Sequence, residues 1–560
     1  MTIDGPTKHP LLKGTSSLWP FVALCLFGCS SSPSSADDGG ASDAAPDNGV
    51  ADVAADAAAD ASLEASCAPL SAIDFDAGTP GTFSGKAGAA CKRDIDCLDG
   101  TFCVVVFETC AKSTMILGPG KGGRANGGGA CRPQPAFPAD CDPLALDWSD
   151  PVDISQNASS LAESDSTVLT DGHGKVLVAW ANNTTVDRQF NGLSLSEDDG
   201  KSFMQIAAPV HLPTDSENDA FLATDDQGLL YYVWEGYGKN FTGAQDVWLA
   251  TSQDGKTWSA ALQVDSAGDN GGGTIPLDFP YVAVNPVNRK PYVTYQVTSS
   301  AGPVPMKLVV GSPGGTSVAP SVELDDGTRP MAFRDLANGV FDTAGSFYAS
   351  WVELGGTGGS TGQGLESGDP ANGVYFTRVD VGGGDAGVTG LGHDVLVNGQ
   401  AETVLFGVPK IQVTRDGSSV FVVYSAGEND AIDLRVAVSH DRGLTFGPSV
   451  KINDDATCAT HYKATATLDP KGRLWVLWYD NRDGAGHIVY AVSDDSGKSF
   501  HPNRLVTPSA FPFETFQYSV GWLGDYFQVV AGGGEIFAAW ADPHDGDRSH
   551  INFAKAILPP

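Results

Sequence analysis

The chain has 560 residues, of which 41% are apolar, and a formal net charge of −35 at pH 7. So large a negative charge argues against nucleic acid and anionic membrane surfaces as partners, because both would repel the chain. The apolar content is sufficient for a large core. A length prior of about 100–200 residues per domain suggests several domains.

The N-terminus has the pattern of an exported protein. Lys8 and Lys13 precede an apolar run, residues 19–27, which is too short to cross a bilayer but suits a secretory signal. Residues 26–29 resemble a bacterial lipobox, which implies a signal peptide over residues 1–28 and a lipid on Cys29. An ordinary signal peptide is the alternative. We expect an exported protein that is lipid-anchored to the bacterial cell envelope, at the outer membrane or cell surface.

Two segments follow the signal. Residues 29–66 are rich in Ala, Asp, Ser and Gly and bury too little apolar surface to fold, so we predict a disordered tether. Residues 67–147 are dense in cysteine, which in an exported chain predicts a small disulfide-rich module. The disulfide candidates are Cys67, Cys91, Cys97, Cys103, Cys110, Cys131, Cys141 and Cys458, with several pairings open. Paired two-residue spacings with nearby histidines are missing, so no metal site is predicted there.

From residue 148 onward, an apolar run that ends in a large aromatic ring recurs seven times. The rings are Trp180, Trp234, Tyr295, Trp351, Tyr424, Trp478 and Trp540. The spacing runs from 54 residues, between Trp180 and Trp234, to 73 residues, between Trp351 and Tyr424. Each ring follows a turn and a shorter apolar strand and precedes two further strands. This period predicts an all-β domain over residues 148–560, a β-propeller of seven four-stranded blades.

A polar turn follows the third strand of several repeats. In these turns a short Asp can accept backbone N–H bonds, a Gly can take positive φ, and an aromatic ring can be buried between sheets. The turn residues are Asp198, Gly200, Phe203; Asp254, Trp258; Asp441, Gly443, Phe446; and Asp495, Gly497, Phe500. The pattern resembles the Asp-box, or bacterial neuraminidase repeat, of the sialidase superfamily, and the resemblance covers roughly residues 148–560.

The resemblance implies a propeller that acts on or recognises extracellular glycans. It implies either a sialidase-like glycoside hydrolase, of which the exo-α-sialidase type is one form, or a non-catalytic carbohydrate- or protein-binding propeller. The implied partner is a glycan or glycoprotein, with membrane contact only through the N-terminal lipid, and the protein is expected to be a monomer. Because sialidases have six blades, six is the alternative to seven. The last repeat has three strands, so residues 148–155 are predicted to add the fourth.

Functional residues are expected where the loops between strands two and three, and between successive blades, meet at one mouth of the channel. The Asp-box turns should lie at the opposite rim. The mouth would then collect Asp165, Asn218, Asp219, Glu235, Asp278, Arg334, Asp335, Glu428, His461, Tyr462, Lys463, Asp480, Asn481, Arg482, Asp483, Tyr518, Asp525, Tyr526, Asp542, His544 and Asp545. A purely structural polar channel end is the alternative.

Sialidase chemistry requires arginines that clamp the sugar carboxylate, an Asp acid, and a Tyr nucleophile beside a Glu. The resemblance assigns the nucleophile to Tyr518, an acid to Asp219 or Asp165, a catalytic carboxylate to Glu235, and the clamp to Arg334 and Arg482. Arg482 is flanked by acidic residues, so ion pairing is its alternative role. No cofactor is expected. The acidic loops leave calcium open, although no segment has EF-hand spacing.

Overall fold

The structure is a computed structural model. It describes residues 101–104, 109–112, 142–155, 162–185, 188–211, 216–238, 242–266, 277–297, 305–325, 333–354, 372–380, 393–399, 402, 404, 407–428, 431–455, 459, 461–507, 509–511, 523–543 and 549–560. The predicted signal peptide, the tether, Tyr518 and Cys458 lie outside these residues. Of the predicted cysteine module, the structure describes 101–104, 109–112 and 142–147. Strands β1 (Thr101–Val104) and β2 (Thr109–Lys112) pair there, with Cys103 opposite Cys110.

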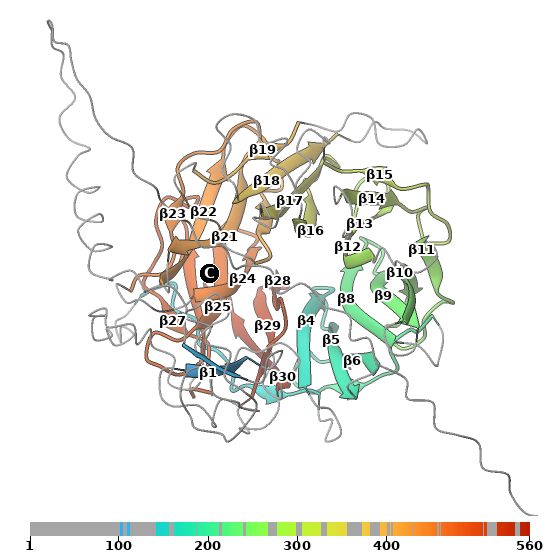
Figure 1. The fold of residues 1–560 in the computed structure, drawn as a ribbon, viewed down its shortest axis with the longest axis horizontal. Helices are drawn as coiled ribbons and strands as arrows, with labels where there is room; N and C mark the ends of the chain where they lie inside the picture. The colour runs from blue at the N-terminus through green and yellow to red at the C-terminus, as the bar shows by residue number, and fades with distance from the viewer. Residues whose placement is uncertain are drawn as a thin grey trace, which may run out of the picture.

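The described strands after residue 142 form seven four-stranded antiparallel sheets around a ring (Figure 1). Blade 1 contains β4 (Ala162–Thr170), β5 (Val176–Thr185), β6 (Arg188–Ser196) and β7 (Met204–Gln205). Blade 2 contains β8 (Ser216–Thr224), β9 (Leu230–Gly238), β10 (Thr242–Ser252) and β11 (Leu262–Ser266). Blade 3 contains β12 (Leu277–Val284), β13 (Pro291–Val297), β14 (Met306–Val310) and β15 (Val322–Glu323).

The remaining blades repeat this order. Blade 4 contains β16 (Phe333–Phe341), β17 (Phe347–Leu354), β18 (Asn372–Val379) and β19 (Val395–Leu396). Blade 5 contains β20 (Lys410–Val413), β21 (Val420–Glu428), β22 (Ala431–Ser439) and β23 (Val450–Lys451). Blade 6 contains β24 (His461–Leu468), β25 (Leu474–Asp480), β26 (His487–Ser493) and β27 (Arg504–Leu505). Blade 7 contains β28 (Gln528–Gly532), β29 (Glu535–Asp542), β30 (His550–Ile557) and β3 (Val152–Asp153).

Blade 7 joins the two ends of the propeller. Val152 of β3 pairs with Phe553 of β30, and Asp153 pairs with Asn552. This pairing covers a sheet edge that would otherwise carry unpaired backbone groups. The predictions of seven blades and of ring closure by residues 148–155 are therefore confirmed. Among the described residues, no helix has the length and apolar content needed to cross a membrane.

Each blade has at its centre one of the seven aromatic rings that marked the repeats. All seven lie in second strands, and each is at most 3% exposed. A buried indole N–H needs an acceptor. Trp478 donates to Asp480 at 2.9 Å and Trp540 donates to Asp542 at 2.8 Å, so an acidic residue two positions further on satisfies the ring.

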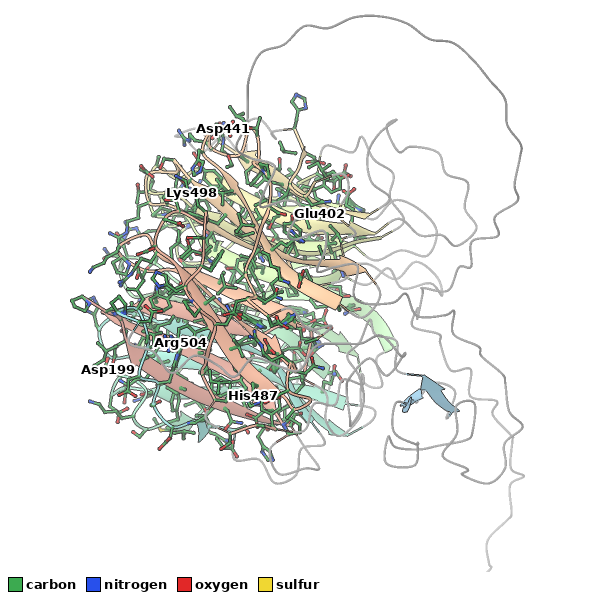
Figure 2. The ribbon with its side chains drawn as sticks, turned by 90° about the vertical axis from the view of Figure 1, so that its left-hand side faces the viewer. Asp199, Glu402, Asp441, His487, Lys498 and Arg504 are labelled. Atoms are coloured by element: carbon green, nitrogen blue, oxygen red, sulfur yellow. The ribbon has the colours of Figure 1, made fainter. Side chains whose placement is uncertain are left out.

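The polar turns have the local geometry expected of them. Asp198 accepts the backbone N–H of Ser202 at 2.9 Å and its hydroxyl at 2.7 Å, and Gly200 has φ of +76°. The turn aromatics, however, are only partly buried. Phe203 meets Phe553 of the preceding blade edge-on at 4.8 Å, because the turn lies at the rim between blades. In the side view, Asp199, Asp441 and Lys498 of three such turns lie along one rim, whereas His487 lies toward the other (Figure 2).

β-Bulges interrupt the first strands of several blades near the opposite rim. The register shifts between Ser164 and Thr167 in β4, and comparable shifts occur in β8, β12, β16 and β24. Asp165, Asp219 and Lys463 adopt positive φ at these bulges, an uncommon conformation for residues other than glycine. A bulge redirects side chains locally, and all three of these residues have ionisable side chains.

Candidate functional site

Carboxylates from four blades meet at the rim opposite the polar turns. They are Asp165 of β4, Asp219 of β8, Glu235 of β9, Asp278 of β12 and Asp525, which precedes β28. One carboxylate oxygen from each of Asp219, Glu235 and Asp278 lies within 4.8 Å of the others, a spacing that could hold a metal ion. We call the five carboxylates from Asp165 to Asp525 the acidic cluster.

Glu235 and Asp278 are joined by a hydrogen bond between their carboxyl groups. Burial raises the pKa of Glu235 well above its ordinary value, and the charges of Asp278 and Asp219 raise it further. Burial also raises the pKa of Asp278, but the hydrogen bond from Glu235 opposes that rise. Asp278 also accepts from the Gln296 amide at 3.2 Å. The raised pKa of Glu235 favours its protonated form, and the hydrogen bond from Glu235 favours the ionised form of Asp278 against the effect of burial.

Asp165, Asp525 and Lys463 form the second part of the mouth. The Asp165 carboxylate accepts the backbone N–H of Asp525 and the Ser164 hydroxyl, the latter at 2.7 Å. Burial raises the pKa of Asp525 to about 7, Asp165 adds to the rise, and the Lys463 ammonium opposes it. Burial lowers the pKa of Lys463, although Asp525 and Asp165 act in the other direction. Asp525 can thus exchange a proton near neutral pH.

Tyr526 spans the space between blade 7 and blade 2. Its hydroxyl donates to Asp219 Oδ1 at 3.2 Å, and its ring stacks on Phe221 with centroids 4.7 Å apart. Burial raises the pKa of Tyr526 well above its ordinary value, and the charges of Asp219 and Asp165 add to this rise. Tyr526 is therefore a neutral hydrogen-bond donor and not a phenolate.

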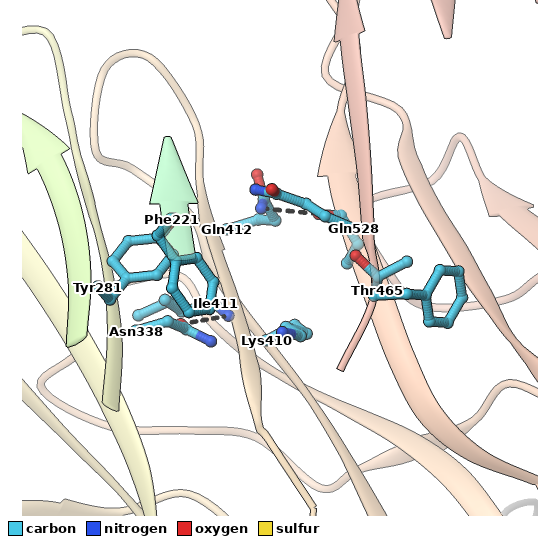
Figure 3. Close-up of a pocket in the computed structure, with 10 residues that line it drawn as sticks. Phe221, Tyr281, Asn338, Lys410, Ile411, Gln412, Thr465 and Gln528 are labelled. Atoms are coloured by element: carbon cyan, nitrogen blue, oxygen red, sulfur yellow. Dashed lines mark hydrogen bonds between the residues drawn. The ribbon is translucent and has the colours of Figure 1, made fainter. Parts of the chain in front are cut away.

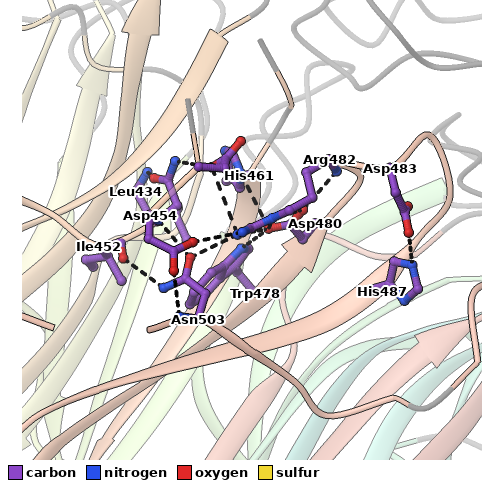
Figure 4. Close-up of polar contacts among 12 residues, drawn as sticks. Leu434, Ile452, Asp454, His461, Trp478, Asp480, Arg482, Asp483, His487 and Asn503 are labelled. Carbon is purple, nitrogen blue, oxygen red and sulfur yellow. Dashed lines mark hydrogen bonds and ion pairs between the residues drawn. The ribbon is translucent and has the colours of Figure 1, made fainter. Parts of the chain in front are cut away.

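Arg482 lies in a separate buried network (Figure 4). Its side chain is 2% exposed, and it donates to Asp480 at 2.7 Å, Asp454 at 2.8 Å and Asn503 at 2.9 Å. His461 lies 3.0 Å from Asp455 and 3.4 Å from Asp480. Burial opposes a charge on His461, but these carboxylates outweigh it and raise its pKa to about 9. The network ties the loop after β25 to blade 5.

The residues assigned from sequence are thus distributed over several places. Asp219 and Glu235 lie together in the acidic cluster, and Arg482 lies in the ion-pair network. Arg334 stands in β16 opposite Glu353. Tyr518 lies outside the described residues.

Asp278, Asp525 and Tyr526 were expected at the mouth but had no assigned catalytic role. Like Asp165 and Asp219, these residues lie near the start of a blade's first strand. That position in the repeat could have identified them from the sequence.

A small cavity lies in the channel between the blades (Figure 3). Its volume is about 30 Å³, space for one or two water molecules but not for a sugar ring. It is lined by Phe221, Tyr281, Asn338, Lys410, Ile411, Gln412, Thr465, Ala466, Phe527 and Gln528. A glycan would therefore have to bind at the mouth and not within the channel.

No family model and no curated protein matches this chain. Several solved structures are similar to it. A protein of unknown function from Dyadobacter fermentans has 13% identity and a TM-score of 0.43, covering 74% of this chain and 99% of that one. An α-L-arabinanase from Penicillium chrysogenum, complexed with arabinobiose, has 14% identity and a TM-score of 0.43 with the same coverage. A Hadza microbial sialidase has 13% identity and a TM-score of 0.38, covering 68% and 76%.

Proposed function

We propose that this protein is an exported lipoprotein whose propeller acts on extracellular glycans at the acidic mouth, by acid–base cleavage of a glycosidic bond. One observation carries the proposal: buried carboxyl groups with raised pKa values meet at a single mouth, and a hydrogen bond from Glu235 favours the ionised form of one of them, Asp278. Glycosidic cleavage by a carboxyl pair needs one protonated acid and one ionised carboxylate. The anchor at Cys29 is supported by the sequence of residues 8–29.

Asp525 is proposed as the general acid, because burial and Asp165 raise its pKa to about 7 and it remains half-buried. In this role it gives its proton to the departing sugar oxygen. Asp278 is proposed as the ionised carboxylate that attacks the anomeric carbon or activates a water molecule. The hydrogen bond from Glu235 favours the charged form of Asp278. Asp219 holds Tyr526 in place across the mouth.

Hydrolysis of a panel of aryl glycosides, including an aryl sialoside, tests this assignment. Asp278→Asn and Asp525→Asn should each lower kcat/KM by about 10²–10⁴-fold, the usual contribution of one acid or base. Asp226→Asn is the matched control, because Asp226 is 62% exposed and pairs only loosely with Arg289 at 3.9 Å. Full activity in both mouth variants would show that the reaction occurs elsewhere.

The sialidase-type version of the proposal adds Tyr518 as nucleophile, supported by its Tyr-Ser context in the last repeat. Tyr518→Phe should then remove turnover of the aryl sialoside by about 10³-fold or more. Equal hydrolysis by parent and variant would reject Tyr518 as the nucleophile without affecting the roles of Asp278 and Asp525.

A non-catalytic glycan-binding propeller is the second candidate. It is favoured by the burial of Asp219 and Glu235, which are 4% and 2% exposed, and by the engagement of Arg482 in ion pairs. Both features leave fewer charged groups to act on a substrate. The parent protein would then show no hydrolysis on the panel, yet bind a glycan array in a way that Asp278→Asn weakens.

A further inference from the structure

The channel cavity contains a lysine at a position where no other blade has a charged residue. In each first strand one residue pairs with the residue just before the blade's central aromatic ring. These residues are Thr167, Phe221, Tyr281, Asn338, Lys410, Thr465 and Gln528. Six of them line the cavity, and Lys410 is the one cation of the set. Because Thr, Phe, Tyr, Asn and Gln fill the same position elsewhere, packing of the ring does not require a lysine.

Lys410 has no acidic neighbour in the cavity. None of the lining residues is a carboxylate, and within the described part of the chain no ion pair forms at Lys410. Its ammonium lies 5.7 Å from the centre of the Tyr526 ring, while the Tyr526 hydroxyl is bonded to Asp219. Burial lowers the pKa of Lys410 to about 7. Lys410 is partly buried, and an anion beside its ammonium would favour the protonated form that burial disfavours.

Gln528 and Thr465 accept backbone N–H groups at the cavity, whereas the amides of Asn338 and Gln412 already donate to the carbonyl oxygens of Pro409 and Ala466. Gln528 Oε1 accepts the backbone N–H of Val168 at 3.0 Å, and Thr465 Oγ1 accepts that of Val529 at 3.1 Å. Because a backbone N–H requires an acceptor, these bonds fix the orientation of the Gln528 amide and occupy the Thr465 oxygen. The Gln528 NH₂ group and the Thr465 O–H are then left as donors that line the same cavity as Lys410 (Figure 3).

We propose that this cavity binds one compact monovalent anion against Lys410. One cation, donor groups and about 30 Å³ of space suit a halide ion or a single carboxylate group. The anion could be a free ion or the carboxylate of an acidic sugar held at the mouth. Anion binding at this site does not require glycoside hydrolysis, so the two proposals can be tested independently.

Thermal unfolding at constant ionic strength tests the site, with a bulky sulfonate, which has no carboxylate and is too large for the cavity, replaced stepwise by chloride, bromide or formate. At ten times the dissociation constant, the parent Tm should rise by about 1–2 °C, following a single-site curve. Lys410→Gln introduces the residue that blade 7 carries and should abolish the rise. The control Lys471→Gln, at an exposed turn, should retain it. Crystals soaked in bromide should show anomalous density beside Lys410 Nζ.

Glucuronate and glucose, compared at low halide, distinguish the two sources of the anion. A Tm rise with glucuronate alone that halide competes away assigns the site to the carboxylate of an acidic sugar. A rise with halide or formate but not with glucuronate assigns it to a free ion. The proposal is overturned if the parent Tm is the same in the bulky sulfonate and in all small anions, if Lys410→Gln keeps the full rise, or if bromide density lies elsewhere.

Discussion

Asp525→Asn should make the protein more stable above neutral pH while it removes activity. The pKa of Asp525 is raised to about 7, against an ordinary value of about 3.9 in an unfolded chain. A carboxyl group with a raised pKa in the folded state favours folding at low pH. That contribution is complete below about pH 4 and is lost as the pH rises toward 7. At pH 8 the parent must bury an ionised Asp525, whereas the Asn variant buries a neutral amide.

A shift of about three pKa units corresponds to about 4 kcal/mol. Because Asp165 shares in this interaction, we expect Asp525→Asn to gain about 2–4 kcal/mol at pH 8 and close to nothing at pH 4. Urea unfolding at both pH values measures the difference, with Asp226→Asn expected to stay within about 0.5 kcal/mol of the parent at each. An Asn variant that is less stable at pH 8, or equally shifted at both pH values, would refute the electrostatic account of the mouth.

Three further outcomes follow from the fold and the N-terminus. Deleting residues 148–155 should lower Tm, because blade 7 loses β3 and the closure it provides; cooperative unfolding at an unchanged Tm would contradict this. Gly443→Ala should lower the free energy of unfolding in urea by about 2–5 kcal/mol, since φ is +86° and the new Cβ would lie 2.1 Å from Phe376. The control Gly472→Ala has a similar φ of +79° but open space around the new Cβ, so it should lower the free energy of unfolding by about 1–2 kcal/mol. Equal losses of stability in the two glycine variants would contradict the packing of the Gly443 turn on Phe376 of blade 4. Cys29→Ser should move the protein from the membrane to the soluble fraction, and unchanged fractionation would reject the lipid anchor.

The blade architecture could be predicted because its signals are local in sequence. Trp180 and its six counterparts each end an apolar run, and turns separate the strands around them, so the repeat is visible without any long-range contact. Closure by residues 148–155 followed from a count, since the last repeat was one strand short. The boundaries of the signal peptide, the tether and the cysteine module stay predictions.

The make-up of the mouth depended on tertiary structure. Asp219 and Asp278 belong to different blades, and Tyr526 next to blade 7 reaches Asp219 of blade 2. No spacing along the chain specifies these contacts. Arg482 met Asp480 and Asp454 because the loop after β25 folds back on blade 5. Local patterns determine which strands form and how they turn, because those choices depend on neighbours in sequence. The protonation of a carboxylate depends on burial and on charges brought near by the closed ring, so only the tertiary structure decides it.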